Sequence, residues 1–369
     1  MNDVIAIYGA QLLAGSIYVA LKSLYRTKVE CFIVSEYSSN PSQIDNIEVL
    51  TLSEYLLRKK YNKILIAVPE EHHSQIVTEL KRHGISDYSV LTSQMRNQIM
   101  EEFYASQGKF VTLRKAYELF HKGRGRENQG HQSIQERENN GQSNFITLYM
   151  ARSSKDKELE REYTPDKWIE QVQAGAAIDG GTLGILRDDF GINISEKNRV
   201  YCELTVLYWL WKNNKRQYMG LCHYRRIFDI NMQECLMIQE LEPDVILPYP
   251  TIHFPNIRSQ HKRYISELEW KILQEAVLHI SPEMTEVWEE ILDSQYFYNY
   301  NMVIARYEVM NNYCLWLFKI LEYVEKLCKR NGIPTSNRFA GYMGEILTTV
   351  YFLYKRNLNI LHIGVNILL

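Results

Sequence analysis

The stretch Gly220-Leu221-Cys222-His223-Tyr224-Arg225-Arg226 places one imidazole and two guanidiniums at the end of an apolar run. The aromatic stretch Tyr208-Trp209-Leu210-Trp211-Lys212-Asn213-Asn214 precedes it. This order is typical of a helix followed by a buried strand. Open α/β sheets bind ligands at the carboxyl ends of their strands, so the basic cluster lies where a ligand site is expected. Two adjacent arginines favour a substrate that carries phosphate.

The composition predicts a two-domain protein whose function depends on local sites. The chain has 369 residues, 46% of them hydrophobic, and a formal net charge of −2, which argues against broad nucleic-acid binding. Its six cysteines form no CxxC pair, and no amino-terminal signal peptide is recognised, so we expect reduced thiols and a cytoplasmic location. No apolar run approaches the roughly 20 residues needed to cross a bilayer, so any membrane contact is expected to be peripheral.

Residues 1–105 are expected to form a small Rossmann-like domain with a parallel sheet, because short apolar strands alternate with helical patterns. The expected strands cover residues 4–8, 29–35, 47–50, 63–68 and 88–91. Gly9 follows the first strand and opens a helix, as in a nucleotide-binding unit. Gln11 and Ala14 stand where the second and third glycines of that fingerprint belong, so Gly9 is a cofactor-binding candidate on an incomplete motif. Glu36 is placed to meet a ribose.

The expected connection, residues 106–143, contains a helix over 109–120 and then a polar stretch that cannot bury enough surface to order itself. Residues 144–369 are expected to form a second α/β domain. Its predicted strands cover residues 145–150, 218–222, 245–247 and 301–305, and its predicted helices cover 199–211, 266–279, 282–292, 308–328 and 339–355.

A turn rich in acidic and amide groups is a second candidate site. It contains Asp188, Asp189 and Asn193, followed by Ser195 and Asn198. Such groups bind sugar hydroxyls or a divalent metal, because hard cations favour carboxylate oxygens. The alternative is an Asp-rich turn in which Ser195 caps the helix that begins near residue 197. The sequence leaves both interpretations open.

The basic cluster has two interpretations as well. His223 would be a general base or contact a phosphate, while Arg225 and Arg226 would hold a diphosphate. Strand alternation predicts that Arg225 points with His223 and that Arg226 points to the other face. Alternatively, a buried arginine pairs with Glu203 or Glu345 in a structural ion network.

Smaller signals lie further along the chain. His253, His261 and Arg263 flank a predicted strand on a loop that would face a substrate, and Asn301 offers an amide to a sugar hydroxyl. Glu345 places a carboxylate on the last long helix.

Four stretches together resemble the DUF4422 family, whose members are expected to be bacterial glycosyltransferases. The stretches are Asp189-Phe190-Gly191-Ile192-Asn193-Ile194-Ser195, Tyr201-Cys202-Glu203-Leu204-Thr205, Tyr208-Trp209 with Trp211-Lys212-Asn213, and Gly220-Leu221-Cys222-His223-Tyr224-Arg225-Arg226. The resemblance extends through Asn301-Met302 and Tyr313-Cys314-Leu315-Trp316-Leu317-Phe318 to Gly344-Glu345, over roughly residues 145–350. Separately, Ile7-Tyr8-Gly9-Ala10 and Ile17-Tyr18 resemble the opening of small Rossmann-like modules attached to sugar-modifying enzymes, and Gln11 departs from that pattern.

The resemblance implies a GT-A-like glycosyltransferase domain that uses a nucleotide-sugar donor, a UDP-sugar first among them. The implied acceptor is a polysaccharide or lipid-linked glycan in capsule, exopolysaccharide or lipopolysaccharide synthesis, at the inner face of the cell membrane. His223, Arg225, Arg226 and Glu345 would be catalytic. The substrate-binding residues would be Asp188, Asp189, Asn193, Asn198, Glu203, Tyr224 and Asn301.

GT-A enzymes usually carry an Asp-x-Asp at the strand that here ends in His223, so metal dependence stays open, with Asp188 and Asp189 as the alternative ligands. Two other classes of function remain. One is a non-catalytic nucleotide- or sugar-binding regulator. The other is an NAD-dependent sugar epimerase or oxidoreductase that binds its cofactor at Gly9.

Overall fold

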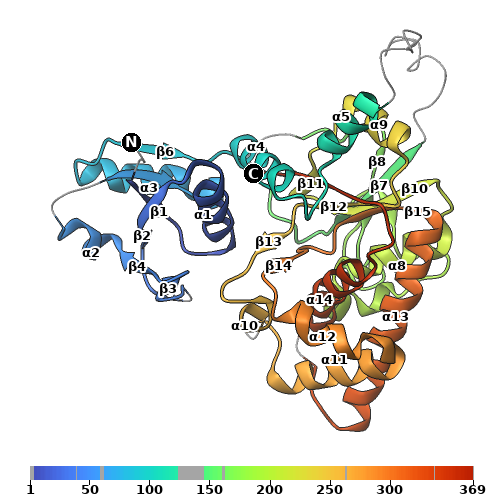
Figure 1. Ribbon diagram of the computed structural model, residues 1–369. Coiled ribbons are helices and arrows are strands. Elements are labelled where there is room, and N and C mark those ends of the chain that lie inside the picture. The colour runs from blue at the N-terminus through green and yellow to red at the C-terminus, as the bar shows by residue number, and fades with distance from the viewer. Residues whose placement is uncertain are drawn as a thin grey trace.

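The chain folds around two β-sheets, seen in a computed structural model that describes residues 4–38, 40–58, 62–123, 145–159, 163–261, 264–335 and 337–368 (Figure 1). Most of the polar stretch expected to link the two domains lies outside the described residues, as does Arg263. The side chain of His261 is not described either. The mixed α/β architecture with parallel sheets confirms the fold class expected from the sequence.

The first sheet has six strands in the order β3-β4-β2-β1-β5-β6. Their bounds are β1 Val4–Tyr8, β2 Lys28–Val34, β3 Gln43–Ile44, β4 Ile47–Thr51, β5 Lys63–Ile66 and β6 Tyr88–Val90. All the pairs are parallel except β3 with β4. Helices α1 (Leu12–Tyr25), α2 (Leu52–Leu56) and α3 (His73–Arg82) connect the strands. We call these elements the N-terminal module.

The second sheet has nine strands, seven of them in the order β16-β12-β15-β10-β7-β8-β9, with β11 and β17 attached beside β10. Their bounds are β7 Ile146–Arg152, β8 Ile169–Gln173, β9 Leu186–Arg187, β10 Tyr218–His223, β11 Arg226–Phe228, β12 Val245–Pro248, β15 Val303–Arg306, β16 Ile360–Ile363 and β17 Val365–Ile367. Strands β7 to β10 run parallel to their neighbours in this group, and β15 runs antiparallel to β10. A separate pair joins β13 (Thr251–Ile252) to β14 (Tyr296–Phe297).

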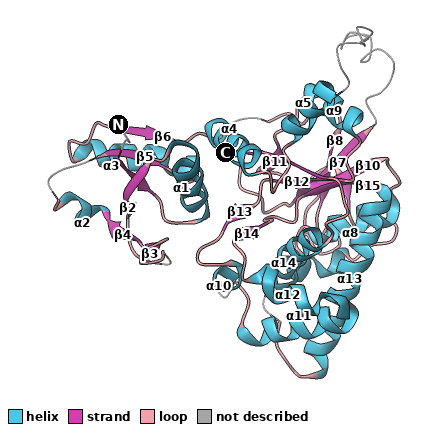
Figure 2. Cartoon of the chain, in the orientation of Figure 1, coloured by secondary structure: helices cyan, strands magenta, loops and turns pink. Residues whose placement is uncertain are grey.

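Helices cover both faces of this sheet (Figure 2). Because side chains alternate along a strand, Met219 and Leu221 of β10 enter one core, while Tyr218 and Cys222 enter the other. The first core is completed by α8 (Leu204–Asn213), α11 (Glu267–Ile280), α12 (Thr285–Leu292), α13 (Tyr307–Arg330) and α14 (Phe339–Tyr354). The second is completed by α5 (Leu113–Gly123) and α9 (Met232–Leu241). No helix in the described ranges is both long and apolar enough to cross a bilayer.

The helix predicted over residues 199–211 is wrong as one element, because the structure divides it into α7 (Asn198–Tyr201) and α8. Cys202 between them has φ 51°, in the left-handed region. The carbonyl oxygen of Cys202 is held by Asn198 Nδ2 at 2.8 Å and by Thr205 Oγ1 at 3.1 Å. Side-chain hydrogen bonds therefore replace the helical ones at this break.

Helix α4 (Ser93–Gln107) joins the two sheets and extends past residue 105, where we expected the first domain to end. It packs against α1 on one side and contacts β17 on the other. Asn97 Nδ2 donates to Asp229 Oδ2 at 3.0 Å and to Asn366 Oδ1 at 3.2 Å. The carboxyl end of the chain consequently lies beside α4 (Figure 1).

Candidate functional site

The basic stretch is a tight hairpin. Strand β10 ends at His223, Tyr224 and Arg225 form the turn, and Arg226 begins β11 as the cross-strand partner of His223. Directly opposite residues of an antiparallel pair project from the same face of the sheet. The predicted alternation, with Arg226 on the opposite face from His223, is therefore wrong, because the chain reverses direction within the motif.

The hairpin lies at a change of direction in the order of the parallel strands. From β7 the chain continues to β8 and β9 on one side, and it then returns to β10 on the other side of β7. In open α/β sheets, such a change leaves a crevice outside the carboxyl ends of the strands, where ligands bind. The strands that flank this point end at Arg152 and His223.

Two consecutive residues with left-handed backbone lie against the hairpin. Tyr300 has φ 72° and Asn301 has φ 51°, and a non-glycine residue in this region costs about 1–2 kcal/mol. The buried Asn301 side chain holds the corner by donating from Nδ2 to Glu203 Oε1 at 2.7 Å and to the Gly341 carbonyl at 3.1 Å. Backbone strain that is fixed in this way is characteristic of functional sites.

The Tyr300 backbone connects His223 to Glu345. Its N–H donates to Glu345 Oε1 at 2.8 Å, and its carbonyl accepts from His223 Nε2 at 2.5 Å. A carbonyl oxygen can only accept, so the His223 proton is on Nε2, and Nδ1 is the accepting nitrogen of the neutral ring. We call His223, Arg226, Tyr300, Glu203 and Glu345 the hairpin cluster.

Burial displaces two pKa values in the hairpin cluster. The pKa of Glu345 is raised from 4.5 to about 8, first by burial and then by the neighbouring Glu203. The pKa of His223 is lowered, chiefly by burial, with Arg226 acting in the same direction. A carboxyl group that titrates near neutral pH beside a neutral imidazole is suited to proton transfer.

Arg226 supplies a cation with an available donor. Its guanidinium lies 4.2 Å from the centre of the Tyr300 ring. Its Nε is buried and has no hydrogen-bond acceptor within the described part of the chain. A buried N–H without an acceptor is costly, so this donor is well suited to an anionic ligand.

Arg225 points away to the N-terminal module. Its guanidinium forms an ion pair with Glu71, and its Nε donates to the Leu368 carbonyl at 3.4 Å. Tyr224, the other turn residue, accepts from the Lys157 backbone N–H at 3.3 Å through its hydroxyl. The two arginines of the motif therefore face different partners.

The sequence analysis overlooked charged groups that flank the hairpin cluster. Asp156 lies near His223, and burial raises the pKa of this carboxyl. It accepts from Arg152 Nε at 3.1 Å. Arg338, just before α14, acts on the carboxyl group of Glu345 and opposes the rise of its pKa. The position of Arg152 at the carboxyl end of β7 was a signal that could have identified it.

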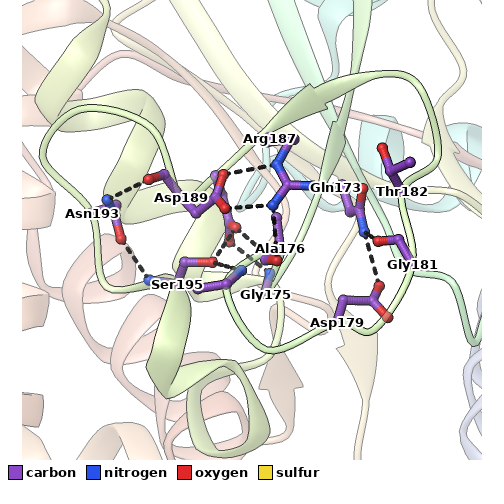
Figure 3. Close-up of polar contacts among 12 residues, drawn as sticks. Gln173, Gly175, Ala176, Asp179, Gly181, Thr182, Arg187, Asp189, Asn193 and Ser195 are labelled. Carbon is purple, nitrogen blue, oxygen red and sulfur yellow. Dashed lines mark hydrogen bonds and ion pairs between the residues drawn. The ribbon is translucent and has the colours of Figure 1, made fainter.

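The acidic turn uses its side chains to hold its own shape (Figure 3). Asp188 is fully buried and accepts from the backbone N–H of Gly175 at 2.8 Å and of Ala176 at 3.0 Å. It also accepts from Ser195 Oγ at 2.5 Å. Ser195 is therefore not a helix cap, because it is the first residue of a 3-10 turn, its hydroxyl is engaged by Asp188, and α7 after that turn has no side-chain cap.

The remaining polar residues of this turn are engaged in the same way. Asp189 forms a fork with Arg187, through Nε to Oδ1 at 3.0 Å and through the terminal nitrogen to Oδ2 at 2.6 Å. Asn193 donates to the carbonyls of Asp189 and Gly191, and it accepts from the Ser195 N–H at 3.1 Å. Asn198 bonds within the break before α8. These contacts favour the Asp-rich turn over a ligand site.

No group of three or more His, Cys, Asp and Glu side chains in the described ranges is arranged to hold a metal ion. The strand end where a metal-binding Asp-x-Asp was considered carries His223 and Arg226 instead.

Gly9, the cofactor-binding candidate, lies in the N-terminal module, whereas the hairpin belongs to the larger sheet. It has φ 123°, and a Cβ there would approach the Ala67 carbonyl oxygen to 2.6 Å. Close packing between β1 and the end of β5 is thus sufficient to require glycine at this position.

Comparison with known proteins identifies the family. The family described as a domain of unknown function, DUF4422, matches residues 155–356, which is more than half of the chain. The chain belongs to this family, as its motifs suggested. No curated protein matches the sequence.

A solved structure shares the fold. The apo structure of WbbM, a bifunctional glycosyltransferase, superposes with a TM-score of 0.52 at 24% sequence identity. The match covers 61% of this chain and 45% of WbbM, so the chain spans less than half the length of that protein.

Proposed function

We propose that this protein is a glycosyltransferase that moves a sugar from a nucleotide-sugar donor to a glycan acceptor at the hairpin cluster. The observation that carries the proposal is the meeting of an available guanidinium, a neutral imidazole and a carboxyl group of raised pKa at one strand end. That strand end lies at the change of direction in strand order, in a fold shared with a glycosyltransferase. We take the sheet to be a GT-A-like domain.

In the proposed reaction, the acceptor hydroxyl oxygen bonds to the anomeric carbon of the donor sugar. The bond from that carbon to the diphosphate oxygen breaks, and its electron pair leaves with the nucleoside diphosphate. Arg226 would donate to the oxygens on which charge grows, which stabilises the transition state more than the ground state. The protein's own cation thereby performs the task that a metal ion performs in other GT-A enzymes.

The proton of the acceptor hydroxyl would pass to Glu345 in its ionised form. The raised pKa of Glu345 makes it a stronger base than an ordinary carboxylate, at the cost of being mostly protonated at neutral pH. His223 would orient the diphosphate or the acceptor, while Glu203 and Asn301 fix the corner that presents Glu345. Tyr224 remains a candidate for contact with the donor.

The family resemblance supports the donor and acceptor proposed here, and the available guanidinium of Arg226 supports a donor that carries phosphate. We take a UDP-sugar as the first donor to test and a polysaccharide or lipid-linked glycan as the acceptor. Such an acceptor places the protein at the inner face of the cell membrane, in capsule, exopolysaccharide or lipopolysaccharide synthesis.

Donor hydrolysis over a panel of nucleotide sugars tests the proposal. Arg226→Ala should lower kcat/KM for the preferred donor by at least about 100-fold, because it removes a charge-assisted contact made to developing charge. Arg225→Ala is the matched control, since this neighbouring arginine pairs with Glu71 and should retain activity within about tenfold. Equal turnover by wild type and Arg226→Ala would remove the proposed role, and turnover of no donor on the panel would contradict the function.

A further inference from the structure

A cavity lies at the carboxyl edge of the N-terminal sheet. It has a volume of about 390 Å³ and is lined by residues that follow β1, β2 and β5, including Gly9, Glu36, Pro69 and His72. Strands β2 and β5 lie on opposite sides of β1, so this edge is also a point where the strand order changes direction. A crevice at such a point is where an open α/β sheet binds its ligand.

One side of this cavity suits hydroxyl groups. Ser35, Glu36 and Ser38 follow β2 and line it with two hydroxyls and a carboxylate. Glu36 is the acidic residue of the cavity lining, and its side chain is exposed to solvent. A carboxylate at the end of the second strand is positioned to accept from the hydroxyls of a ribose.

Another part of the lining, at the start of α1, suits a phosphate group. Ala10, Gln11 and Leu13 of the turn into α1 line the cavity. The first turn of this 14-residue helix has no acidic residue, and the Gln11 side chain does not cap it but donates to Asn40 Oδ1 at 2.6 Å. The amino-terminal N–H groups of α1 therefore face no carboxylate of their own turn, and the helix dipole favours an anion there.

We propose that this cavity binds a nucleoside phosphate, with Glu36 accepting from the ribose hydroxyls and the phosphate at the amino-terminal end of α1. Leu13, Val34 and Ile76 supply apolar surface for the base. This site is separate from the hairpin cluster. The proposed transfer reaction does not require a ligand in this cavity.

The segment that forms part of the cavity wall also contacts the hairpin turn. The segment from Pro69 to His72 contributes to the lining, and Glu71 within it forms the ion pair with Arg225 of the hairpin turn. The neighbouring Glu70 accepts from the Ser93 N–H, at the start of α4, at 2.5 Å. A ligand that shifts this segment would therefore act on two of the contacts that link the module to α4 and to the hairpin turn. Such coupling is reciprocal, so donor binding at the hairpin would alter affinity in the cavity.

Calorimetric titration of the full chain tests the proposal, with ADP and UDP as probes and their 2′-deoxy forms as matched ligands. The titrations use an Arg226→Ala background, in which the proposed donor site is disabled, so that binding at the two sites is distinguished. We expect one equivalent of ADP or UDP to bind, with the ribose form preferred by about tenfold, since a hydrogen bond to a charged group is worth about one to two powers of ten in affinity.

Two variants locate the binding. Glu36→Ala should remove the preference for ribose over deoxyribose, and Gln75→Trp should weaken both forms at least about tenfold by placing a ring over the cavity mouth. Both positions are exposed, so thermal unfolding should stay within a few degrees of the background protein. Failure of ADP and UDP to bind at 1 mM probe, or binding that neither variant changes, would overturn the proposal. Donor hydrolysis by the wild type is measured separately and tests the transfer reaction alone.

Discussion

Replacing Glu345 with glutamine should change how both stability and activity depend on pH. The folded pKa of this carboxyl is raised from 4.5 to about 8, so between these two values the folded chain binds a proton that the unfolded chain has lost. Stability from this group is fully present below pH 4.5 and is lost as the pH rises through 8. The slope is at most about 1.4 kcal/mol per pH unit, which gives a loss on the order of 2–4 kcal/mol for a partly exposed side chain.

Chemical denaturation at pH 5, 7 and 9 measures this effect. Glutamine stays neutral at every pH, so Glu345→Gln should gain stability relative to wild type as the pH rises, and the difference should level off above pH 8. His223 contributes its own pH dependence, which the two proteins share to a first approximation. Glu275→Gln, an exposed position on α11, is the matched control and should follow wild type at all three values.

Activity gives the second readout. If the ionised form of Glu345 is the base, kcat/KM for donor transfer rises about tenfold per pH unit and reaches a plateau near pH 8. Glu345→Gln should lose about 100-fold to 10,000-fold and lose the step in the profile. This account of Glu345 would be refuted if the free energy of unfolding and kcat/KM of Glu345→Gln changed with pH as they do in wild type.

Four further predictions concern other parts of the structure. Asp188→Ala should lower the free energy of unfolding by more than about 2 kcal/mol in a denaturant titration, because two buried backbone N–H groups lose their acceptor; a loss below 0.5 kcal/mol would show that the turn does not depend on it. Gly220→Ala should cost about 1–3 kcal/mol in the same assay, since its Cβ would lie 2.5 Å from the Val303 carbonyl oxygen; an unchanged midpoint would contradict that packing. Glu71→Gln should cost less than about 1 kcal/mol, because its ion pair with Arg225 is partly exposed; a larger loss would mean that this pair is a main support of the domain contact. Donor hydrolysis should stay within about twofold after treatment with EDTA, because side-chain cations replace the metal ion; loss of activity that Mn²⁺ restores would exclude this mechanism.

Local patterns predicted five of the six strands of the N-terminal module, because each of the five contains apolar residues in a short run bounded by turn residues, and they missed β3. Elements without a strong hydrophobic periodicity were missed. Helix α4 has polar residues on most of its surface, yet it forms because it packs between α1 and β17. The two-residue strands β3, β9, β13 and β14 are too short to give a local pattern, and the last three pair with strands that are distant in the sequence.

The candidate site was predictable as a set of motifs and not as an arrangement. His223, Arg226, Glu203, Asn301 and Glu345 were all identified, but their meeting depends on the left-handed corner at Tyr300, which has no glycine to signal it. Strand alternation predicted Arg225 on the same face as His223. Because the chain reverses at the hairpin, Arg226 is the residue on that face. Asp188 was attractive as a ligand because carboxylates bind metals, whereas its burial among backbone N–H groups is a property of the folded turn.

The most direct test of the central claim is a crystal structure of the protein with UDP bound. The account predicts diphosphate oxygens within hydrogen-bond distance of Arg226 Nε, beside His223, with the Tyr300 corner unchanged. A diphosphate held instead by Asp188 and Asp189 through a metal ion, or found in the N-terminal cavity alone, would contradict the assignment of the hairpin cluster as the donor site.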